Sequence, residues 1–141
     1  MSDLVVDASV AVKWFFPEVY AEAALRLLEG RYTLRAPDLI FSEFGNALWK
    51  RVLKDEISKE EAAAAIEALL GLPLYVESSR SLIPVALEIA CGARRTVYDS
   101  LYLAAAIARQ CPFVTADSKL HNALKKSPIS PHLLWVEEIP R

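Results

Sequence analysis

The sequence has few of the residues that cross-link a chain and none of the long apolar runs that anchor one in a membrane. Of 141 residues two are cysteine, Cys91 and Cys111, and they do not have metal-site spacing. We expect both to be small core residues, with a disulfide between them as the less favoured alternative. No apolar run is long enough to span a membrane, and the N-terminus lacks the regions of a signal peptide. These absences predict a cytoplasmic protein without membrane contact.

An excess of positive charge is also missing. The chain has 16 lysines and arginines against 18 aspartates and glutamates, a net charge of −2. This balance does not indicate a strongly basic nucleic-acid binder, although carboxylates neutralised by a metal would change the count. Basic residues do occur in pairs, at 50–51, 94–95 and 125–126. Such pairs are typical of solvated surface but also suit contact with a phosphate backbone.

What the chain does have is the composition of a folded domain. It is 54% hydrophobic and 24% charged, which argues against disorder. Its length suits one domain, residues 1–141, that buries a core without cross-links. No internal repeat, low-complexity tract or linker interrupts it.

Short apolar runs alternate with longer helical segments. Strands are predicted at 4–6, 32–35, 74–76, 113–115 and 133–136, and helices at 9–16, 18–29, 37–54, 58–71, 80–91 and 96–110, with a short one beginning at Asp117 or Ser118. This alternation predicts an α/β fold, with a parallel sheet of about four to five strands between two helical layers and more helix than strand.

Local signals predict where several helices begin and end. Ser9 is expected to cap the first helix, which Pro17 stops. Ser58 and Glu61 have the spacing of a capping box, and Thr96 is expected to cap the last long helix. Gly92 is expected to close the helix before it.

Four acidic residues have recognisable neighbourhoods. Asp7 in LVVDAS and Asp117 in FVTADSKL follow apolar strand-like runs, whereas Glu43 in FSEFGNALW and Asp99 in TVYDSLYLAAA lie in early helical turns. Taken singly, each aspartate is explained as a helix cap. Glu43 is not, because it lies on the apolar stripe of its helix with no basic residue three or four positions away. A buried carboxylate there needs a partner from elsewhere in the fold.

The joint placement of these acids is more informative than any one of them. In a doubly wound sheet, ligands bind beyond the carboxyl ends of the strands, near the point where strand order reverses. We expect all four side chains at that edge. Carboxylates share a small site only when they are protonated or hold a hard cation, so the sequence predicts Mg²⁺, or Mn²⁺ as a substitute, and phosphate chemistry.

In this order the motifs resemble those of PIN-domain ribonucleases, in particular the VapC-type toxins of toxin–antitoxin pairs. The resemblance covers essentially the whole chain: VVDAS at the start, Pro37 to Asn46 around Glu43, the Tyr98-Asp99 pair leading into LYLAAA, and Thr115 before Asp117. It implies a PIN-like fold and metal-dependent endonucleolytic hydrolysis of RNA phosphodiester bonds. It also implies two protein partners, a cognate antitoxin and a second copy of the chain.

The resemblance and the physics together assign roles. Asp7 and Asp99 are expected to bind metal directly, Glu43 to bind metal or orient the attacking water, and Asp117 to complete a second metal position or bind through water. Donors that hold these carboxylates in place are expected from Ser9, Asn46 and Thr115, with capping or strand filling as the alternative.

Other functions stay open. A haloacid-dehalogenase-type phosphatase needs a second acid two positions after Asp7, where Ser9 stands, and a receiver domain needs a different arrangement of acids. A PIN-fold RNA-processing nuclease without a toxin role, and a non-catalytic RNA- or partner-binding module, are the nearer alternatives. The aromatic segment 12–17, Trp49 and Leu53 are expected mainly in the core, with an exposed partner groove as the alternative.

Overall fold

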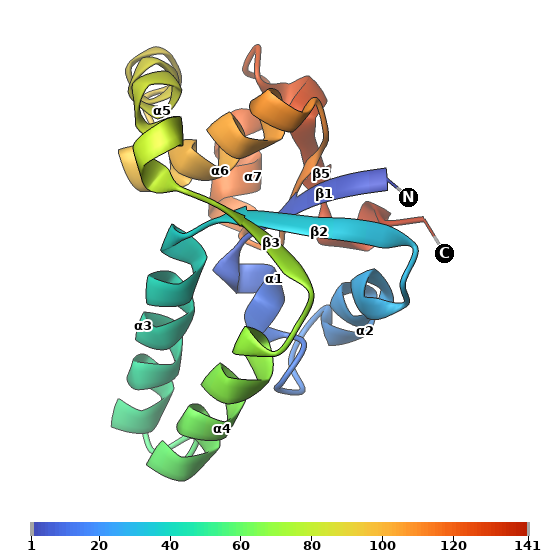
Figure 1. Cartoon of the computed structure of the whole chain (residues 1–141), viewed down its shortest axis with the longest axis vertical. Coiled ribbons are helices and arrows are strands. Elements are labelled where there is room, and N and C mark those ends of the chain that lie inside the picture. The colour runs from blue at the N-terminus through green and yellow to red at the C-terminus, as the bar shows by residue number, and fades with distance from the viewer. Residues whose placement is uncertain (1, 141) are drawn as a thin grey trace.

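A computed structural model describes residues 2–140 and shows strands and helices in alternation (Figure 1). The strands are β1 (Ser2–Val6), β2 (Tyr32–Pro37), β3 (Leu74–Glu77), β4 (Phe113–Thr115) and β5 (Leu133–Trp135). The α-helices are α1 (Ala8–Val12), α2 (Ala21–Leu25), α3 (Leu39–Leu53), α4 (Lys59–Leu70), α5 (Ser79–Ala93), α6 (Val97–Arg109) and α7 (Ser118–Leu124). Short 3-10 helices are η1 (Arg26–Leu28), η2 (Ser130–His132) and η3 (Val136–Glu138).

All neighbouring strands pair in parallel, in the order β3-β2-β1-β4-β5. Figure 1 shows α1 to α4 on one side of the sheet and α5 to α7 on the other. The central strands are apolar because both of their faces are covered: Val5 and Val6 of β1, and Phe113 and Val114 of β4, are fully buried. The predicted three-layer α/β fold with a parallel sheet is confirmed.

The strand order reverses at β1. The chain moves outward from β1 to β2 and β3, and then returns through α5 and α6 to pair β4 with the opposite edge of β1. Val6, the last residue of β1, pairs with Val114 of β4, so these two strands end side by side. In a doubly wound sheet such a switch point leaves a crevice beyond the strand ends. Asp7 and Asp117 follow these two strands, as the sequence predicted.

Helix starts follow the sequence more closely than helix ends. The capping box of Ser58 and Glu61 is present, and Thr96 caps α6. The first helix differs: it ends at Val12, and Asp7 rather than Ser9 caps it. Asp7 has extended backbone angles and accepts the Val10 amide, while residues 13–16 continue as tighter turns bonded three and four residues back.

Three other expectations, two about helix bounds and one about burial, were wrong. The helix expected over 18–29 is shorter, because Tyr20 takes a left-handed conformation (φ 67°) and α2 starts after it. Helix α5 passes through Gly92 and ends at Ala93, and its C-cap residue Arg94 is also left-handed. Of the two cysteines, which are both free in the described structure, Cys111 is buried as expected but Cys91 is exposed.

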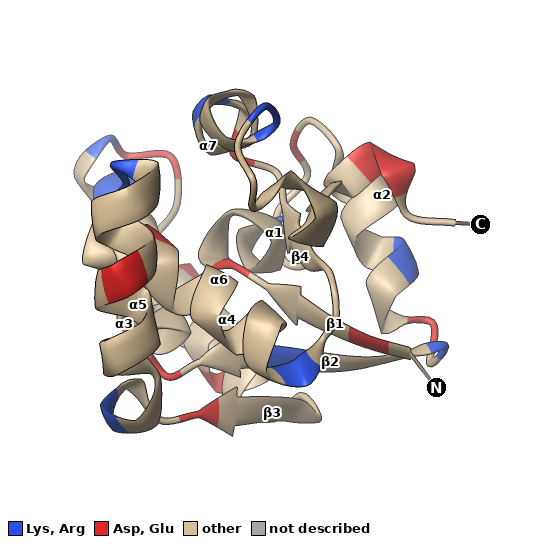
Figure 2. Ribbon diagram, turned by 90° about the horizontal axis from the view of Figure 1, so that it is seen from above, with Lys and Arg blue, Asp and Glu red and all other residues tan. Residues whose placement is uncertain are grey.

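The surface carries both signs of charge. Figure 2 shows lysine and arginine scattered over separate helices and loops, interspersed with acidic residues. This agrees with the small net charge of the sequence. Within residues 2–140, no helix combines the length and the apolar character that crossing a membrane requires.

Candidate active site

Asp7 is the most deeply buried acid at the switch point, with a relative exposure of 7%. Its Oδ1 accepts hydrogen bonds from Ser9 Oγ at 2.6 Å and from the Val10 amide at 3.1 Å, and its Oδ2 accepts one from Thr115 Oγ1 at 2.7 Å. Burial raises the pKa of Asp7 from 3.8 to about 6, and the hydrogen bonds limit that rise. The nearby charge of Glu43 raises the pKa further.

Ser9 and Thr115 fix the two strand ends to each other as well as to Asp7. Ser9 Oγ also accepts the Ala116 amide at 3.1 Å, and Thr115 Oγ1 accepts the Asp117 amide at 3.1 Å. Each hydroxyl therefore donates to the Asp7 carboxylate and accepts from the β4–α7 loop. This network links the loops after β1 and β4 across 107 and 108 residues of sequence.

Glu43 lies on α3 and reaches toward the opposite helical layer. Its Oε1 accepts a hydrogen bond from the hydroxyl of Tyr102, on α6, at 2.6 Å. The ring of Tyr102 stacks on Phe113 of β4 with 5.5 Å between centroids, which holds the hydroxyl in place. Burial is the main cause that raises the pKa of Glu43, and the charge of Asp99 adds to it. Tyr102 is thus the partner that the sequence required for this carboxylate.

Asp99 and Asp117 lie at helix starts, and each has a partner. Asp99, in the first turn of α6, accepts a hydrogen bond from Arg95 at 3.1 Å. Asp117 caps α7 and accepts the amides of Lys119 and Leu120 at 3.0 and 3.2 Å. Asp117 therefore has the capping role expected of a lone aspartate, whereas the Asp99 carboxylate does not cap α6, which Thr96 caps instead.

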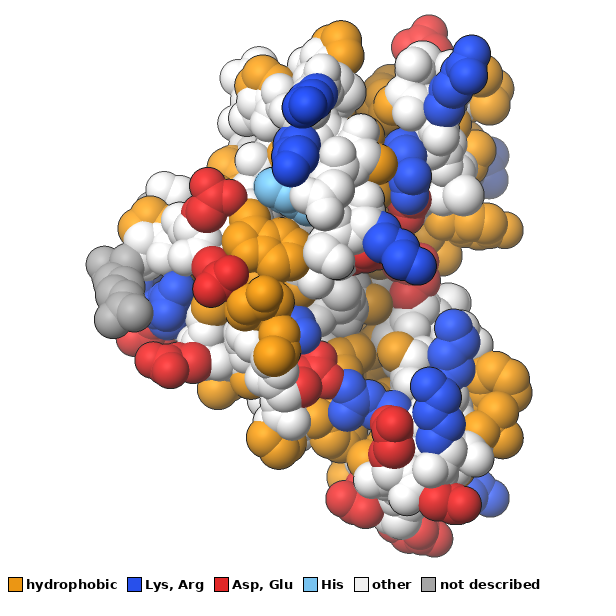
Figure 3. All heavy atoms as spheres, turned by 180° about the vertical axis from the view of Figure 1, so that it is seen from behind, with side chains coloured by type: hydrophobic (Ala, Val, Ile, Leu, Met, Phe, Trp, Pro, Cys, Tyr) orange, Lys and Arg blue, Asp and Glu red, His pale blue; other side chains and the backbone are white. Residues whose placement is uncertain are grey.

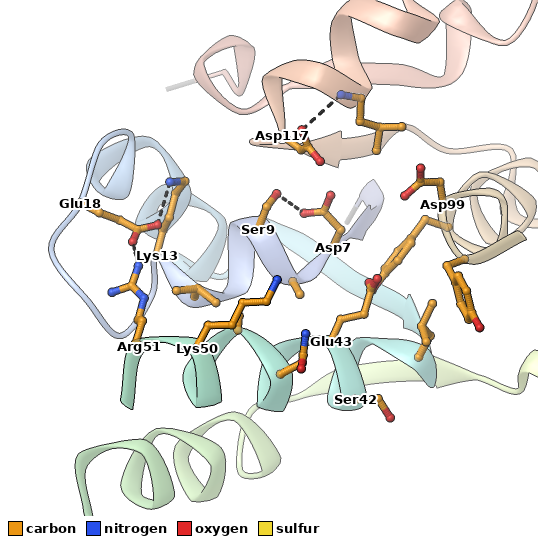
Figure 4. A pocket seen from close by; sticks show the side chains of 18 of the residues that line it. Asp7, Ser9, Lys13, Glu18, Ser42, Glu43, Lys50, Arg51, Asp99 and Asp117 are labelled. Carbon is orange, nitrogen blue, oxygen red and sulfur yellow. Dashed lines mark hydrogen bonds and ion pairs between the residues drawn. The ribbon is translucent and has the colours of Figure 1, made fainter. Parts of the chain in front are cut away.

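All four carboxylates line one pocket of about 830 Å³ (Figure 4). Figure 4 shows Asp7 in the centre, Asp117 above it, Asp99 to its right and Glu43 rising from α3 below. Ser9 and Asn46 line the same pocket, whereas Thr115 is fully buried and acts on the site only through its hydrogen bonds. The structure therefore brings together the residues that the sequence singled out, from the segments that follow β1 and β4 and from α3 and α6.

The donor set fits a divalent cation in chemical type, because carboxylate oxygens are the preferred ligands of Mg²⁺ and Mn²⁺. The charge of Glu43 raises the pKa of Asp7 and the charge of Asp99 raises the pKa of Glu43, so Glu43 is within electrostatic reach of both aspartates. Among residues 2–140 no three side chains already converge at ligand distances.

Sequence reasoning missed two features of this pocket. Tyr102 was passed over as part of an apolar helix, although it stands three residues after Asp99 and so shares a helix face with it. The other missed feature is a cluster of Lys13, Glu18 and Arg51 at the far end of the pocket. The sequence gives no signal for this cluster, because its residues come from different parts of the chain and meet only in the folded structure.

Comparison with known proteins identifies the family. The model of the PIN domain matches residues 4–126. The chain belongs to the PIN-domain family. It is 37% identical over 125 residues to Ribonuclease VapC1 of Mycobacterium tuberculosis (strain CDC 1551 / Oshkosh), a match that covers 87% of this chain and 92% of the relative. The resemblance to VapC-type proteins that the motifs carry is thereby confirmed.

Solved structures show the same fold at lower identity. The crystal structure of PAE2754 from Pyrobaculum aerophilum superposes with a TM-score of 0.70 at 24% identity, covering 96% of this PIN-domain chain and 85% of that one. VapBC2 from Rickettsia felis, solved with a DNA fragment from the promoter of the pair, gives a TM-score of 0.67 at 16% identity, with 94% and 98% covered. At these identities the likeness concerns the fold.

Replacing Tyr102 by Phe tests how Glu43 is held. The variant removes only the hydroxyl and keeps the ring on Phe113, so we expect an unchanged fold. Loss of the 2.6 Å hydrogen bond leaves the Glu43 carboxylate free to turn, so we expect metal affinity to fall. The loss of such an orienting partner typically lowers metal affinity or activity roughly 10–100-fold. Mn²⁺ titration by calorimetry measures the affinity directly. Affinity equal to wild type would show that Tyr102 does not position Glu43.

Proposed function

We propose that this PIN-domain protein is a metal-dependent endoribonuclease and the toxin of a toxin–antitoxin pair. The observation that carries the proposal is the pocket itself: Asp7, Glu43, Asp99 and Asp117 come from four separate elements and line one cavity. The 37% identity to Ribonuclease VapC1, over nearly all of both chains, supports RNA as the substrate class. We take residues 1–141 as one PIN-like domain.

In this proposal the four carboxylates are the metal-binding residues. Asp7 and Asp99 bind directly, Glu43 binds or orients the attacking water, and Asp117 serves a second position. Ser9 and Thr115 hold Asp7 in a single orientation through hydrogen bonds of 2.6 and 2.7 Å. A bound Mg²⁺ or Mn²⁺ would polarise the scissile phosphate and offset its negative charge.

The raised pKa values support a cation at this place. Burial is the main cause that raises the pKa of Asp7 to about 6 and that of Glu43 as well, and a cation bound between the two carboxylates would offset this cost. Asn46 lies one turn beyond Glu43 on α3 and lines the same pocket. In this proposal its amide contacts substrate or holds Glu43.

Metal dependence has a direct test. A labelled single-stranded RNA should be cut with Mg²⁺ or Mn²⁺ and left intact in EDTA, because the carboxylates alone cannot neutralise the phosphate. Adding either metal should also raise the melting temperature. At a metal concentration 100 times Kd, binding adds about 2.7 kcal/mol to the free energy of unfolding. Cleavage that persists in EDTA, or no cleavage with either metal, would contradict the proposal.

Two protein partners belong to the proposal, a cognate antitoxin and a second copy of the chain. A toxin–antitoxin complex from Klebsiella pneumoniae has the same fold, with a TM-score of 0.67 at 13% identity. The expectation that Trp49 and Leu53 lie in the core was wrong, since they are 56% and 63% exposed on α3, whereas Trp14 is buried. Exposed apolar residues of this kind are typical of interfaces.

An RNA-processing nuclease without a toxin role is the alternative. Expression of the protein separates the two, because only a toxin should arrest growth and be relieved by the product of a neighbouring gene.

A further inference from the structure

The pocket that holds the four acids also has a basic end. Lys13, Lys50, Arg51 and Lys54 line it, together with the carboxylates of Glu18 and Glu56. Four cations against two acids leave an excess of two positive charges there. Figure 3 shows basic side chains gathered over the α3–α4 part of the molecule, next to a hollow. The chemistry of the acidic end gives no reason for this charge.

Two of the cations share one carboxylate within the protein. Lys13 Nζ lies 2.8 Å from Glu18 Oε1, and Arg51 binds the other oxygen of the same carboxylate. Lys13 is buried, and burial followed by the charge of Arg51 lowers its pKa. Arg51 also lies over the ring of Phe16, 5.1 Å from its centroid. These contacts fix Lys13 and Arg51 as a structural wall of the pocket.

Lys50 differs from this pair. It is exposed, and within residues 2–140 its amine takes part in no hydrogen bond or ion pair of the structure. It shares a face of α3 with Glu43 and Asn46, at intervals of three and four residues. Seven residues of helix place Lys50 roughly 10 Å along the pocket from Glu43. Figure 4 shows its side chain rising from α3 into the pocket, on the side of Ser9.

We propose that Lys50 binds a backbone phosphate of single-stranded RNA next to the one that is cleaved. This inference rests on the proposed nuclease function and adds a substrate-binding position to it. An unpaired ammonium beside the acid cluster, set in a wall with excess positive charge, is suited to a phosphodiester oxygen. The carboxylates repel the backbone, so a cation at this distance also favours the register that brings one phosphate to the acids.

The experiment compares Lys50→Gln with Lys59→Gln. Both remove one positive charge from an exposed position, but Lys59 begins α4 and lies outside the pocket. Steady-state cleavage of a short labelled RNA should show KM raised roughly tenfold for Lys50→Gln, with kcat within about twofold of wild type. The logarithmic salt dependence of RNA binding should also become shallower by about 0.7, the amount of one phosphate contact on a single strand. Lys59→Gln should match wild type, and Lys50→Arg should restore most of the affinity.

The outcomes separate this inference from the function it rests on. If wild type neither binds nor cuts RNA, the nuclease proposal itself fails. If wild type cuts RNA and Lys50→Gln has the KM and salt slope of Lys59→Gln, the phosphate position at Lys50 is wrong while the nuclease proposal stands. A loss confined to kcat would also overturn it, because the charge would then act in the chemical step. Thermal unfolding of each variant confirms that the fold is intact.

Discussion

Replacement of Asp7 by Asn is expected to lower RNA cleavage by at least about 100-fold. Asn keeps the size of the side chain, the helix cap and an oxygen for Ser9 and the Val10 amide, but it removes the charge. Loss of one group that stabilises charge in a phosphoryl or acyl transfer typically costs about 10²–10³ in rate. Initial cleavage rates at saturating Mg²⁺ measure the effect, and Asp99→Asn should give a loss of the same order.

Asp55→Asn is the matched control for this pair. Asp55 is exposed, lies outside the pocket and has a left-handed backbone (φ 57°), a conformation that Asn also tolerates. The control removes the same charge and should cleave RNA at the wild-type rate. Activity retained in both Asp7→Asn and Asp99→Asn would show that the carboxylates at the switch point are not the catalytic group.

The same Asp7→Asn variant is expected to be more stable than wild type when metal is absent. Since the pKa of Asp7 is about 6 in the fold against 3.8 ordinarily, the folded state binds a proton that the unfolded chain has released. The resulting stability is fully present below about pH 4 and is lost as the pH rises through 6. The ionised carboxylate therefore costs about 3 kcal/mol at pH 7.5. Asn does not ionise and avoids that cost.

Thermal unfolding in EDTA at pH 5.0 and 7.5 tests this prediction. Wild type should lose stability between the two values, whereas Asp7→Asn should change less and melt roughly 10 °C higher at pH 7.5. Saturating Mg²⁺ should reduce the difference, because the cation compensates the buried charge only in wild type. If Asp7→Asn is less stable than wild type at pH 7.5, the prediction is wrong. The hydrogen bonds to the ionised Asp7 would then stabilise the fold by more than its burial costs.

Activity and stability are thus expected to change in opposite directions at one residue. This combination distinguishes a lost catalytic group from a damaged fold, since an unfolded variant would lose both. It would also show that the charge of Asp7 supports activity at a cost in stability. Asp7 is held in a buried position by Ser9 and Thr115, and the fold tolerates the cost because a charge is needed there.

The sequence determined the elements and the order of the site. Continuous apolar runs predicted β1 and β4, because strands covered on both faces need apolar residues throughout. Local hydrogen-bonding signals predicted the starts of α4 and α6, since a cap depends on residues within one turn. The alternation of strands and helices, with acids directly after strands, was enough to predict a carboxylate pocket at the switch point.

The tertiary structure decided which groups meet in that pocket. Tyr102 binds Glu43 across 59 residues of sequence, and Thr115 binds Asp7 across 108. A local sequence pattern covers only a few residues and cannot predict either pair. The shared ion pairs of Glu18 and the free amine of Lys50 likewise depend on how α3 packs beside α1. Local sequence controls backbone conformation within a turn or a strand, whereas contacts between distant residues follow from the packing of whole elements.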